Sequence, residues 1–582
     1  EKTRETLLTV GNGYFGTRGA LEETDAGKFN YPGTYIAGLY NRLTSKVGER
    51  DVENEDFVNC PNWLPIRFKV GEGDFVDINS AEIKTISRKL NFRNGVLHKK
   101  MIVEDRQGRE TRIESFRLAS MENPHMAAIR YEVTPVNYSE QITIQSVLDG
   151  DIINDGVERY RQLNQQHLEP VEEGFGEDQS WIKVKTTQSA IEVAVAAKLK
   201  IESPEGVTID HKKNPGKVIT EIPVNLKEGK TAVVEKIVSI YSSQDWDSRE
   251  PLGDARNDLR KNMSFDQLKD HNVETWKNIW KKIDVKIEGD RLAQKLLRLH
   301  LYHLIVSLSP HSAHYDVSIT ARGLHGEAYR GHIFWDELFI LPLYNLHYPE
   351  ITRSCLMYRY RRLDAARAYA KEQGYMGAMF PWQSGSDGRE ETQVVHLNPV
   401  TGKWGPDYSS FQRHISLAVA YNTWQYVHAT NDLEFLADYG AEMFLDICRF
   451  WASKTYKDES TGRYSIKNVM GPDEFHEKYP GADEGGVKDN TYTNIMVVWA
   501  IDKAFELLDR LSLQQKAKVL DKLQLSISEL EMWKNIASGL NIVIKDDILA
   551  QYDGYFDLEE LDWDHYRNKY GNIYRMDRLL KA

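Results

Sequence analysis

The residues that could do chemistry gather in three short stretches of the sequence. The first, NVMGPDEFHEKYPG (468–481), places four ionisable side chains within five residues: Asp473, Glu474, His476 and Glu477. A carboxyl that is partly buried beside a second carboxylate has a raised pKa, so Glu474 next to Asp473 is a candidate general acid near neutral pH. A solvated charge run on a loop explains the same spacing, and the spacing alone favours that simpler interpretation.

The second stretch, YRGHIFWDELF (329–339), places Trp335 beside Asp336 at an expected loop-to-helix junction. An indole stacks on the C–H face of a pyranose ring, and a neighbouring carboxylate accepts hydrogen bonds from its hydroxyls. The structural alternative makes Asp336 a helix N-cap and Trp335 a core residue. The pair taken alone slightly favours that alternative.

The third stretch, GYMGAMFPWQSGSDGREET (374–392), contains Trp382, Gln383 and Glu391 on a loop that Pro381 and several glycines prevent from continuing a helix. A polar loop with a central tryptophan fits the wall of a ligand cleft. It fits a solvated connector with one anchoring tryptophan equally well.

A glycine-rich stretch, GNGYFGTRGALEE (11–23), raises the question of a phosphate-binding loop. It lacks the Lys-Ser/Thr ending of a P-loop, and no strand-helix unit surrounds it. The sequence therefore predicts tight turns between strands here.

Three regions with different patterns of apolar residues must position these stretches. Alternating apolar runs such as IRFKVGEGDFVDI and AVVEKIVSIYS, separated by turn signals, predict an antiparallel β-sandwich over residues 1–246. Strand formers become rare over residues 247–286, which predicts a helical linker. Over residues 287–582, long segments with a 3.6-residue apolar period predict paired helices of an α/α barrel with the site in loops at one end. The predicted fold class is multidomain α+β.

Composition excludes several function classes. The formal net charge of −13 over 582 residues argues against nucleic acid or an anionic membrane as the main partner. The three cysteines are far apart, and no His/Asp/Cys cluster has ligand spacing, so neither a disulfide framework nor a metal site is expected. No apolar run is long enough to span a bilayer.

The cellular location is expected only from the number of cysteines. A reducing cytoplasm is the expected compartment of a chain with so few cysteines. The sequence begins with Glu1 and stops inside a helical pattern, so we expect it to be incomplete at both ends. A leader peptide and a periplasmic location therefore stay open.

Several motifs together resemble glycoside hydrolase family 65. They are GNGYFGTRG, PGTYIAGLYN, GHIFWDE, GYMGAMFPWQS, NVMGPDEFHE and DNTYTN, and they run in family order over nearly the whole chain. The family contains inverting α-glucoside phosphorylases and a smaller set of hydrolases. The resemblance implies an N-terminal β-sandwich, a helical linker, an (α/α)6 barrel and a small C-terminal β domain.

The resemblance also implies roles for individual residues. Glu474 matches the general acid of the family. Trp335 and Asp336 match residues that hold the glucosyl unit in the −1 subsite, and Trp382 and Gln383 match the pair that faces the +1 sugar. The order of the motifs outweighs the structural alternatives given above for these positions.

Two further candidate substrate-binding residues are Glu391 on the loop and His414 at the start of the next helical segment. The family places the base glutamate of its hydrolases and the phosphate-binding residues of its phosphorylases after the last helices seen here. We therefore expect both beyond Ala582, and the general base is left unassigned. The chemistry requires no metal or cofactor, and inorganic phosphate is a co-substrate only in a phosphorylase.

Departures from the family pattern favour hydrolysis. FWDEL stands where phosphorylases usually have FWDTE, PWQSGSDGREET stands where they have PWES, and an insertion follows before the next helix. The leading expectation is an inverting α-glucosidase that releases β-glucose from an α-linked glucose disaccharide or oligosaccharide of the kojibiose (α-1,2) type. One alternative is a phosphorylase of kojibiose, nigerose, maltose or trehalose that releases β-glucose 1-phosphate.

Two non-catalytic alternatives remain. One is an inactive carbohydrate-binding member of the family, which intact GPDE and FWDE motifs disfavour. The other is a large helical scaffold with a β appendage, which would make the motif order a coincidence. By analogy with family phosphorylases, a homodimer is one expected assembly.

Overall fold

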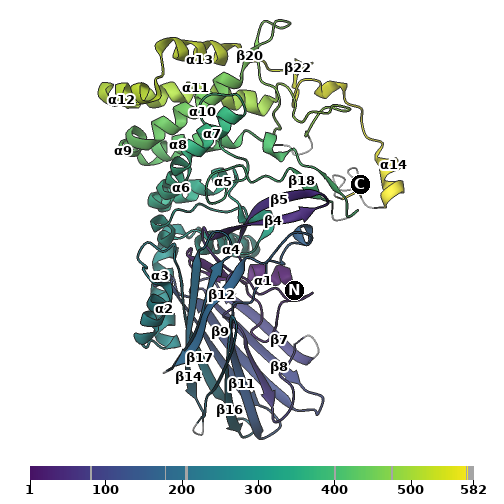
Figure 1. Ribbon diagram of the computed structural model, residues 1–582, viewed down its shortest axis with the longest axis vertical. Helices are drawn as coiled ribbons and strands as arrows, with labels where there is room; N and C mark the ends of the chain where they lie inside the picture. Colours follow the sequence, from purple (N-terminus) through teal and green to yellow (C-terminus); the bar gives the residue numbers. More distant parts are fainter. Residues whose placement is uncertain are drawn as a thin grey trace. The chain divides into compact units, whose positions relative to one another are not determined.

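The chain folds into two compact units (Figure 1). The computed structural model describes residues 1–78, 81–176, 178–203, 207–398, 401–472, 476–571 and 573–574. The first unit comprises Glu1–Val157 and Leu163–Gly331, and the second comprises Glu158–Gln162 and the described part of 332–582.

Antiparallel sheets dominate the first unit. An eight-stranded sheet has the order β12 (Leu168–Gly176), β13 (Gln179–Thr186), β14 (Glu192–Glu202), β17 (Ala232–Ser242), β10 (Met126–Pro135), β9 (Glu110–Ala119), β8 (Val96–Glu104) and β7 (Glu82–Asn91). A four-stranded sheet has the order β15 (Asp210–Asn214), β16 (Lys217–Leu226), β11 (Glu140–Asp149) and β6 (Ile66–Val70). β4 (Tyr40–Val47) and β5 (Arg50–Phe57) form a separate hairpin.

The two larger sheets share one apolar core. Buried side chains of both sheets belong to a single cluster, which contains Ile142 and Ile144 of β11 together with Ile129 and Val133 of β10. Along β16 buried and less buried residues alternate, because successive side chains of a strand point to opposite faces. The predicted sandwich and its alternating runs are therefore seen in the structure.

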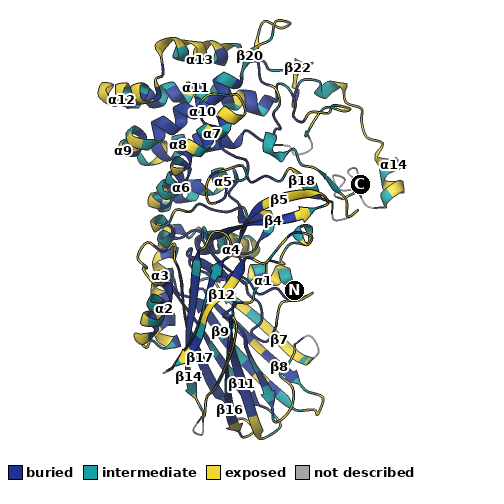
Figure 2. Ribbon diagram, viewed as in Figure 1, coloured by how far each residue is buried: buried dark blue, intermediate teal, exposed yellow. Residues whose placement is uncertain are grey.

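One strand departs from that alternation for a clear reason. Every residue of β17 is buried, because helices α2 (Pro251–Arg260) and α3 (Phe265–Ile283) cover the other face of its sheet (Figure 2). A separate apolar cluster contains Ile237 of β17 together with Leu259 and Phe265 of these helices. The predicted linker region thus forms helices, and these helices pack on the sheet.

The glycine-rich stretch forms tight turns, as the sequence predicts. It connects the short strands β1 (Val10–Gly11), β2 (Phe15–Thr17) and β3 (Thr34–Ile36). Gly13 has a φ of +84°, and a Cβ there would lie 2.4 Å from the Oγ of Ser309. Only glycine satisfies both conditions, so this position is fixed by backbone geometry.

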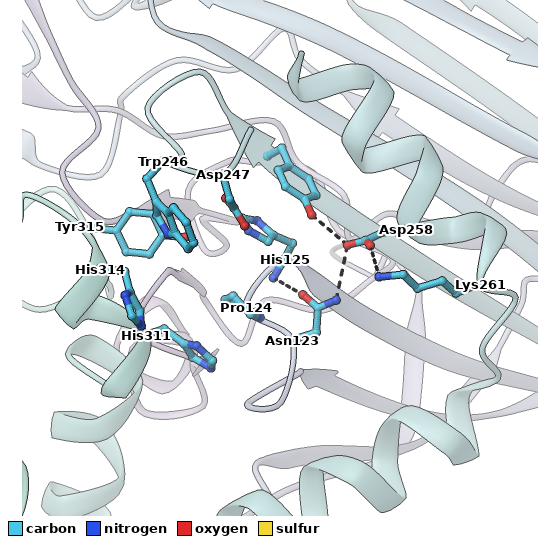
Figure 3. Close-up of a pocket in the computed structure, with 11 residues that line it drawn as sticks. Asn123, Pro124, His125, Trp246, Asp247, Asp258, Lys261, His311, His314 and Tyr315 are labelled. Atoms are coloured by element: carbon cyan, nitrogen blue, oxygen red, sulfur yellow. Dashed lines mark hydrogen bonds and ion pairs between the residues drawn. The ribbon is translucent and has the colours of Figure 1, made fainter. Parts of the chain in front are cut away.

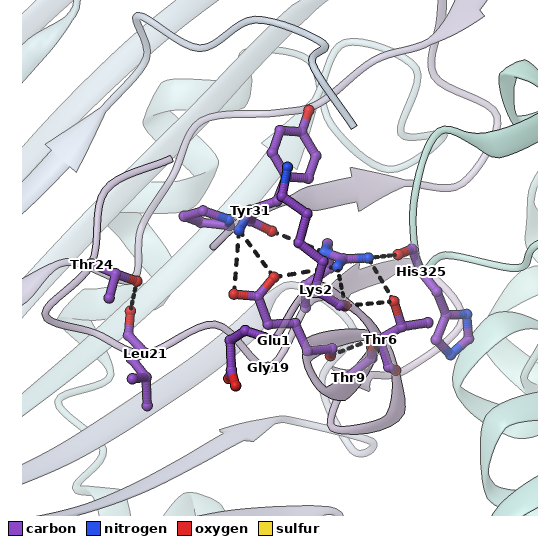
Figure 4. Close-up of polar contacts among 12 residues, drawn as sticks. Glu1, Lys2, Thr6, Thr9, Gly19, Leu21, Thr24, Tyr31 and His325 are labelled. Carbon is purple, nitrogen blue, oxygen red and sulfur yellow. Dashed lines mark hydrogen bonds and ion pairs between the residues drawn. The ribbon is translucent and has the colours of Figure 1, made fainter. Parts of the chain in front are cut away.

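A buried arginine ties the start of the chain to the rest of the first unit. Arg18 donates hydrogen bonds to the carbonyl oxygens of Tyr31 at 2.9 Å and His325 at 2.6 Å, and to the Thr6 hydroxyl at 2.8 Å (Figure 4). It also pairs with the buried carboxylate of Glu5 at 3.3 Å. Helix α1 (Lys2–Leu7) is thereby held against segments far away in sequence.

Helices make up most of the second unit. They are α5 (Glu337–His347), α6 (Pro349–Arg361), α7 (Leu363–Glu372), α8 (Ile415–Thr430), α9 (Leu433–Phe435), α10 (Ala441–Lys454), α11 (Thr491–Arg510), α12 (Leu513–Leu523), α13 (Ile527–Gly539) and α14 (Trp563–Tyr570). The apolar faces of α6, α8, α10, α11 and α13 meet in one core cluster. This mixture of a β-rich and a helical unit agrees with the predicted α+β class, while the (α/α)6 barrel stays a prediction.

The contacts divide the chain at Gly331. α4 (Arg291–Ser307) belongs to the first unit because Tyr302 stacks on Trp276 of α3 at 5.0 Å and donates to the carbonyl of Thr9 at 3.3 Å. The domain limits 1–246, 247–286 and 287–582 stay predictions. Among the residues that the structure describes, every helix is too short or too polar to cross a membrane.

Candidate active site

Four aromatic side chains meet in the second unit. The Trp335 ring lies 6.4 Å from that of Trp382, 4.7 Å from that of His414 and 6.2 Å from that of Tyr492. The rings of Trp382 and His414 are 5.1 Å apart, and those of His414 and Tyr492 are 6.0 Å apart. We call these four residues the aromatic cluster. Three of them are candidate site residues that the sequence places up to 79 positions apart, from 335 to 414.

The cluster forms where four segments meet. Trp335 lies directly before α5, His414 directly before α8, and Tyr492 in the first turn of α11. Trp382 comes from the loop between α7 and α8. Loops and helix starts thus supply all four rings, which is the arrangement expected of a site built on a helical scaffold.

Asp336 occupies the N-cap position of α5, yet its side chain makes no capping hydrogen bond. Trp335 is half-buried, whereas Trp382 and His414 are buried. The structural alternative thus agrees with the structure in the N-cap position of Asp336, but not in a capping side-chain hydrogen bond. The assignment of this indole and carboxylate to sugar binding stays a prediction.

A buried ion pair holds the turn that carries Trp335 and Asp336. Arg359 of α6 donates from Nε and Nη2 to one oxygen of Glu337, at 3.0 and 2.7 Å. The same Nη2 donates to the carbonyl oxygen of Phe334 at 3.1 Å. The guanidinium of Arg359 therefore binds the residue before Trp335 and the residue after Asp336.

Backbone pairing joins this turn to the loop that carries Trp382. Ile333 and Ser384 exchange two hydrogen bonds, of 3.0 and 3.1 Å. Beside this bridge, His332 Nδ1 lies 3.0 Å from Gln383 Oε1. The pairing explains why Trp335 and Trp382 meet.

Glu390 organises the loop from within. Its carboxylate accepts hydrogen bonds from the backbone nitrogens of Trp382 at 2.8 Å, Gln383 at 3.2 Å and Thr392 at 3.1 Å. It also accepts from the Thr392 hydroxyl at 2.7 Å and the Tyr369 hydroxyl at 3.3 Å. Each of these partners is a donor, so an ionised carboxylate suits the position and a neutral amide does not.

Glu391, a candidate substrate-binding residue, is 8% exposed, and its backbone nitrogen donates to the Gln383 carbonyl at 3.1 Å. Burial lowers the pKa of His414 to about 4, an effect that the nearby Met470 backbone partly opposes. His414 is therefore neutral at pH 7, and it contributes a ring face and imidazole nitrogens without positive charge.

Glu474, the candidate general acid, lies outside the described residues. The segment before it is well anchored: Met470 donates to the carbonyl oxygen of Phe411 at 2.8 Å, and Val469 pairs with Val487. Gly471 packs so closely on the Asn490 side chain that a Cβ would lie 2.3 Å from it. This segment therefore runs past the starts of α8 and α11, which also carry His414 and Tyr492.

Sequence reasoning did not select Tyr492, Arg359 or Glu390 as site residues. Tyr492 had a usable signal, because it follows the N-cap Asn490 of a long apolar helix inside the DNTYTN motif. Arg359 and Glu390 act through partners at long range or through backbone nitrogens, and residue spacing reveals neither kind of contact.

Comparisons with known proteins identify the family. The model for the glycosyl hydrolase family 65 N-terminal domain matches residues 1–279, and that for the family 65 central catalytic domain matches residues 298–582. The chain belongs to glycoside hydrolase family 65.

Several curated proteins are similar to this family 65 chain over nearly its whole length. A trehalose 6-phosphate phosphorylase of Lactococcus lactis is 36% identical over 590 residues, covering 100% of this chain and 72% of the relative. A kojibiose phosphorylase of Caldanaerobacter subterraneus is 35% identical over 585 residues, covering 96% and 71%. An uncharacterised glycosyl hydrolase of Mycobacterium tuberculosis is 40% identical over 586 residues, and the chain spans only 44% of its length.

The fold has a solved counterpart. A structure provisionally named a kojibiose phosphorylase, from the human microbiome, matches with a TM-score of 0.82 at 24% identity, covering 98% of this chain and 73% of that chain. At this identity the likeness shows the fold alone. The family 65 fold, with a β-rich N-terminal part and a helical part after it, is therefore established for this chain.

Proposed function

We propose that this family 65 chain belongs to an inverting phosphorylase of an α-linked glucose disaccharide. The observation that carries the proposal is that the named curated relatives matching at 35–36% identity over nearly the whole chain are phosphorylases. Hydrolysis is the second candidate, and the assay below separates the two reactions.

In this proposal the aromatic cluster and Asp336 hold the glucosyl ring. The Trp335 indole stacks on its C–H face, and the carboxylate of Asp336 accepts from its hydroxyls. Trp382 and Gln383 face the second sugar, with Glu391 and His414 behind them. The neutral imidazole of His414 suits a site in which positive charge develops on the sugar.

The bond changes follow the inverting pattern. Glu474 gives its proton to the glycosidic oxygen, the C1–O bond breaks, and the ring flattens towards an oxocarbenium ion. An oxygen of inorganic phosphate forms the new bond to C1 from the opposite face, which gives β-glucose 1-phosphate and the free second sugar. The proton of the attacking hydrogen phosphate returns the acid to its starting state. Phosphate is thus a co-substrate, and no metal or cofactor takes part in the proposed chemistry.

The test uses the full-length protein with kojibiose, nigerose, maltose, trehalose and trehalose 6-phosphate, each with and without inorganic phosphate. Products and their anomers are followed by NMR at early times. The proposal expects β-glucose 1-phosphate, formed only when phosphate is present. Free β-glucose at a rate that phosphate does not change would overturn it and establish the hydrolase. The favoured sugar of the panel gives the linkage, and a homodimer stays a prediction.

A further inference from the structure

The first unit carries a cleft of about 300 Å³ that is lined by residues of that unit alone (Figure 3). Its walls come from three segments: residues 123–125, residues 241–261 and residues 311–315. The second of these begins at the end of β17. Its volume lies at the lower end of the range of small-molecule sites. The candidate active-site residues belong to the second unit, so their proposed chemistry leaves this cleft without a role.

An exposed indole stands at the rim of the cleft. The Trp246 side chain is 68% exposed, and its ring lies 5.9 Å from that of His314 at an angle of 34°. The preceding residue, Asp245, is buried and accepts hydrogen bonds from the Tyr14 hydroxyl and the Ser242 backbone nitrogen, both at 2.7 Å. A large apolar ring is therefore presented to solvent on an anchored turn. A flat ligand face is what such an indole would cover.

Two imidazoles offer hydrogen-bond acceptors. His125 is 3% exposed, and its Nδ1 lies 2.9 Å from the carbonyl oxygen of Ile240, which can only accept, so Nδ1 carries the proton. Its Nε2 is buried and has no hydrogen-bond partner within the described part of the chain. His311 is placed similarly, with Nε2 2.9 Å from the carbonyl oxygen of Met121. Burial lowers the pKa of both rings, so both are neutral at pH 7.

The charges of the cleft add acceptors rather than donors. The ammonium group of Lys261 is already paired with Asp258 at 2.6 Å, and the Tyr241 hydroxyl donates to the same carboxylate at 3.1 Å. Asp247, next to the indole, supplies a second carboxylate. The three charged side chains therefore sum to −1, from two aspartates and one lysine. A phosphate or nucleotide would bring further acceptors and negative charge into a lining that already has an excess of both.

We propose that this cleft binds a neutral hexose unit of a carbohydrate. The Trp246 indole covers the C–H face of the sugar, while Asp247 and Nδ1 of the partly buried His311, whose Nε2 carries the proton, accept hydrogen bonds from its hydroxyls. A hexose is rich in hydroxyl donors, carries no charge and has one apolar face, so it complements all three features. A metal is the poorer fit, since among the described residues no group of three His, Cys, Asp or Glu side chains could hold one.

The experiment measures sugar binding at this cleft by ligand-detected saturation-transfer NMR of the full-length protein. The probes are methyl α-D-glucoside and maltose without phosphate, and Asp336→Asn is introduced to weaken binding at the candidate active site. We expect millimolar binding to persist in this variant and to weaken at least tenfold when Trp246→Ala is added. Trp563→Ala, at a 43% exposed tryptophan of the second unit, is the matched control and should leave binding unchanged.

Three outcomes would overturn the proposal. They are a double variant that binds sugar as well as Asp336→Asn alone, an Asp336→Asn protein that shows no binding at tens of millimolar sugar, and inorganic phosphate that displaces the sugar from the cleft. His311→Gln, which keeps an acceptor, gives a second test and should weaken binding less than Trp246→Ala. The Trp246→Ala single variant should keep the turnover of the intact enzyme. None of these measurements depends on whether the enzyme uses phosphate or water.

Discussion

Glu327 of the first unit has partners of a different kind from those of two carboxyl groups beside the aromatic cluster, Glu337 and Glu390. In the second unit, Glu337 faces the guanidinium of Arg359, and Glu390 accepts hydrogen bonds from three backbone nitrogens and two hydroxyls. In the first unit, Glu327 accepts from the hydroxyls of Tyr31 and Tyr35, the latter at 3.0 Å, and from a backbone nitrogen at 2.9 Å. Within the described part of the chain, no ion pair joins Glu327 to a basic side chain.

The lack of a cationic partner affects the ionisation of two carboxyl groups of the first unit, Glu327 and Asp245. Burial raises the pKa of Glu327 to about 7 and that of Asp245 to about 6. A carboxyl with phenol partners and no cation therefore takes up a proton near neutral pH. Beside the aromatic cluster, by contrast, the carboxylates have a guanidinium or a set of N–H donors as partners. The difference teaches that a buried carboxyl of this fold can lack a cationic partner, as Glu327 does, or have a guanidinium or several N–H donors as partners, as Glu337 and Glu390 do.

The largest expected effect concerns the one carboxyl that is proposed to transfer a proton rather than hold a turn. Glu474→Gln should lower kcat by about 10²–10⁴-fold on an unactivated disaccharide, because the glycosidic oxygen then leaves without its proton. Disaccharide binding, measured by calorimetry, should change little. Asp483→Asn, at an exposed residue of the same loop region, is the control and should keep full activity. Normal turnover by Glu474→Gln would show that this glutamate is not the acid.

A second change turns Glu337 into a counterpart of Glu327. Arg359→Met removes the guanidinium and leaves a buried carboxylate without a cation, which should lower the free energy of unfolding by about 3–5 kcal/mol. Adding Glu337→Met should restore much of that loss, since the uncompensated charge is then gone. Chemical denaturation of both variants checks this, with Arg361→Met at an exposed position of the same helix as the control. If the single and double variants are equally unstable, the ion pair is not what holds this turn.

The third prediction concerns pH and the first unit. The pKa of Glu327 is about 7 in the folded protein and about 4.5 in the unfolded chain, so between these values the folded state binds more protons. Its contribution to stability is therefore full below pH 4.5, falls as the pH rises and is lost above pH 7, by roughly 3 kcal/mol in total. Asp245 acts in the same direction.

Glu327→Gln removes this titration. Relative to the wild type, the variant should lose stability at pH 5 and recover part of the difference by pH 8, because glutamine stays neutral throughout. Denaturation midpoints at several pH values give this difference, and Asp74→Asn, at an exposed residue of the same unit, should run parallel to the wild type. A constant offset between Glu327→Gln and the wild type at every pH would mean that Glu327 does not titrate in this range.

Much of the fold was visible in the sequence because short-range patterns determine it. The runs at β6, β10, β14 and β17 alternate or remain apolar throughout, and all four form strands. The segment 349–374, in contrast, has one continuous helical period in the sequence but forms two helices, α6 and α7. Arg362 breaks it with φ −103° and ψ 12°, and its guanidinium stacks 3.6 Å from the Tyr358 ring centroid. This break depends on a contact that the helical period does not encode.

The candidate site was visible only in part. Trp335 and Trp382 were selected from motifs and His414 from its place at the start of a helical segment, and the ring distances place them together. The residues that hold them in place were not selected. Arg359 lies 22 residues from Glu337, and its role depends on how α6 packs against the start of α5. Aromatic and acidic residues on a loop indicate a candidate site from the sequence alone. A residue such as Arg359, which holds the loop in place, cannot be told from any other helix residue by its sequence.

The smallest expected effect concerns Glu390, the carboxylate that organises the loop carrying Trp382. Glu390→Gln keeps the size of the side chain but points an amide donor at partners that are all donors, Trp382, Gln383, Thr392 and Tyr369. The loss of one or two hydrogen bonds to a charged acceptor should cost about 1–3 kcal/mol of stability and raise KM more than it lowers kcat. Glu372→Gln, on the exposed end of α7, is the matched control. A Glu390→Gln enzyme with unchanged KM and melting temperature would show that the backbone holds this loop without the carboxylate.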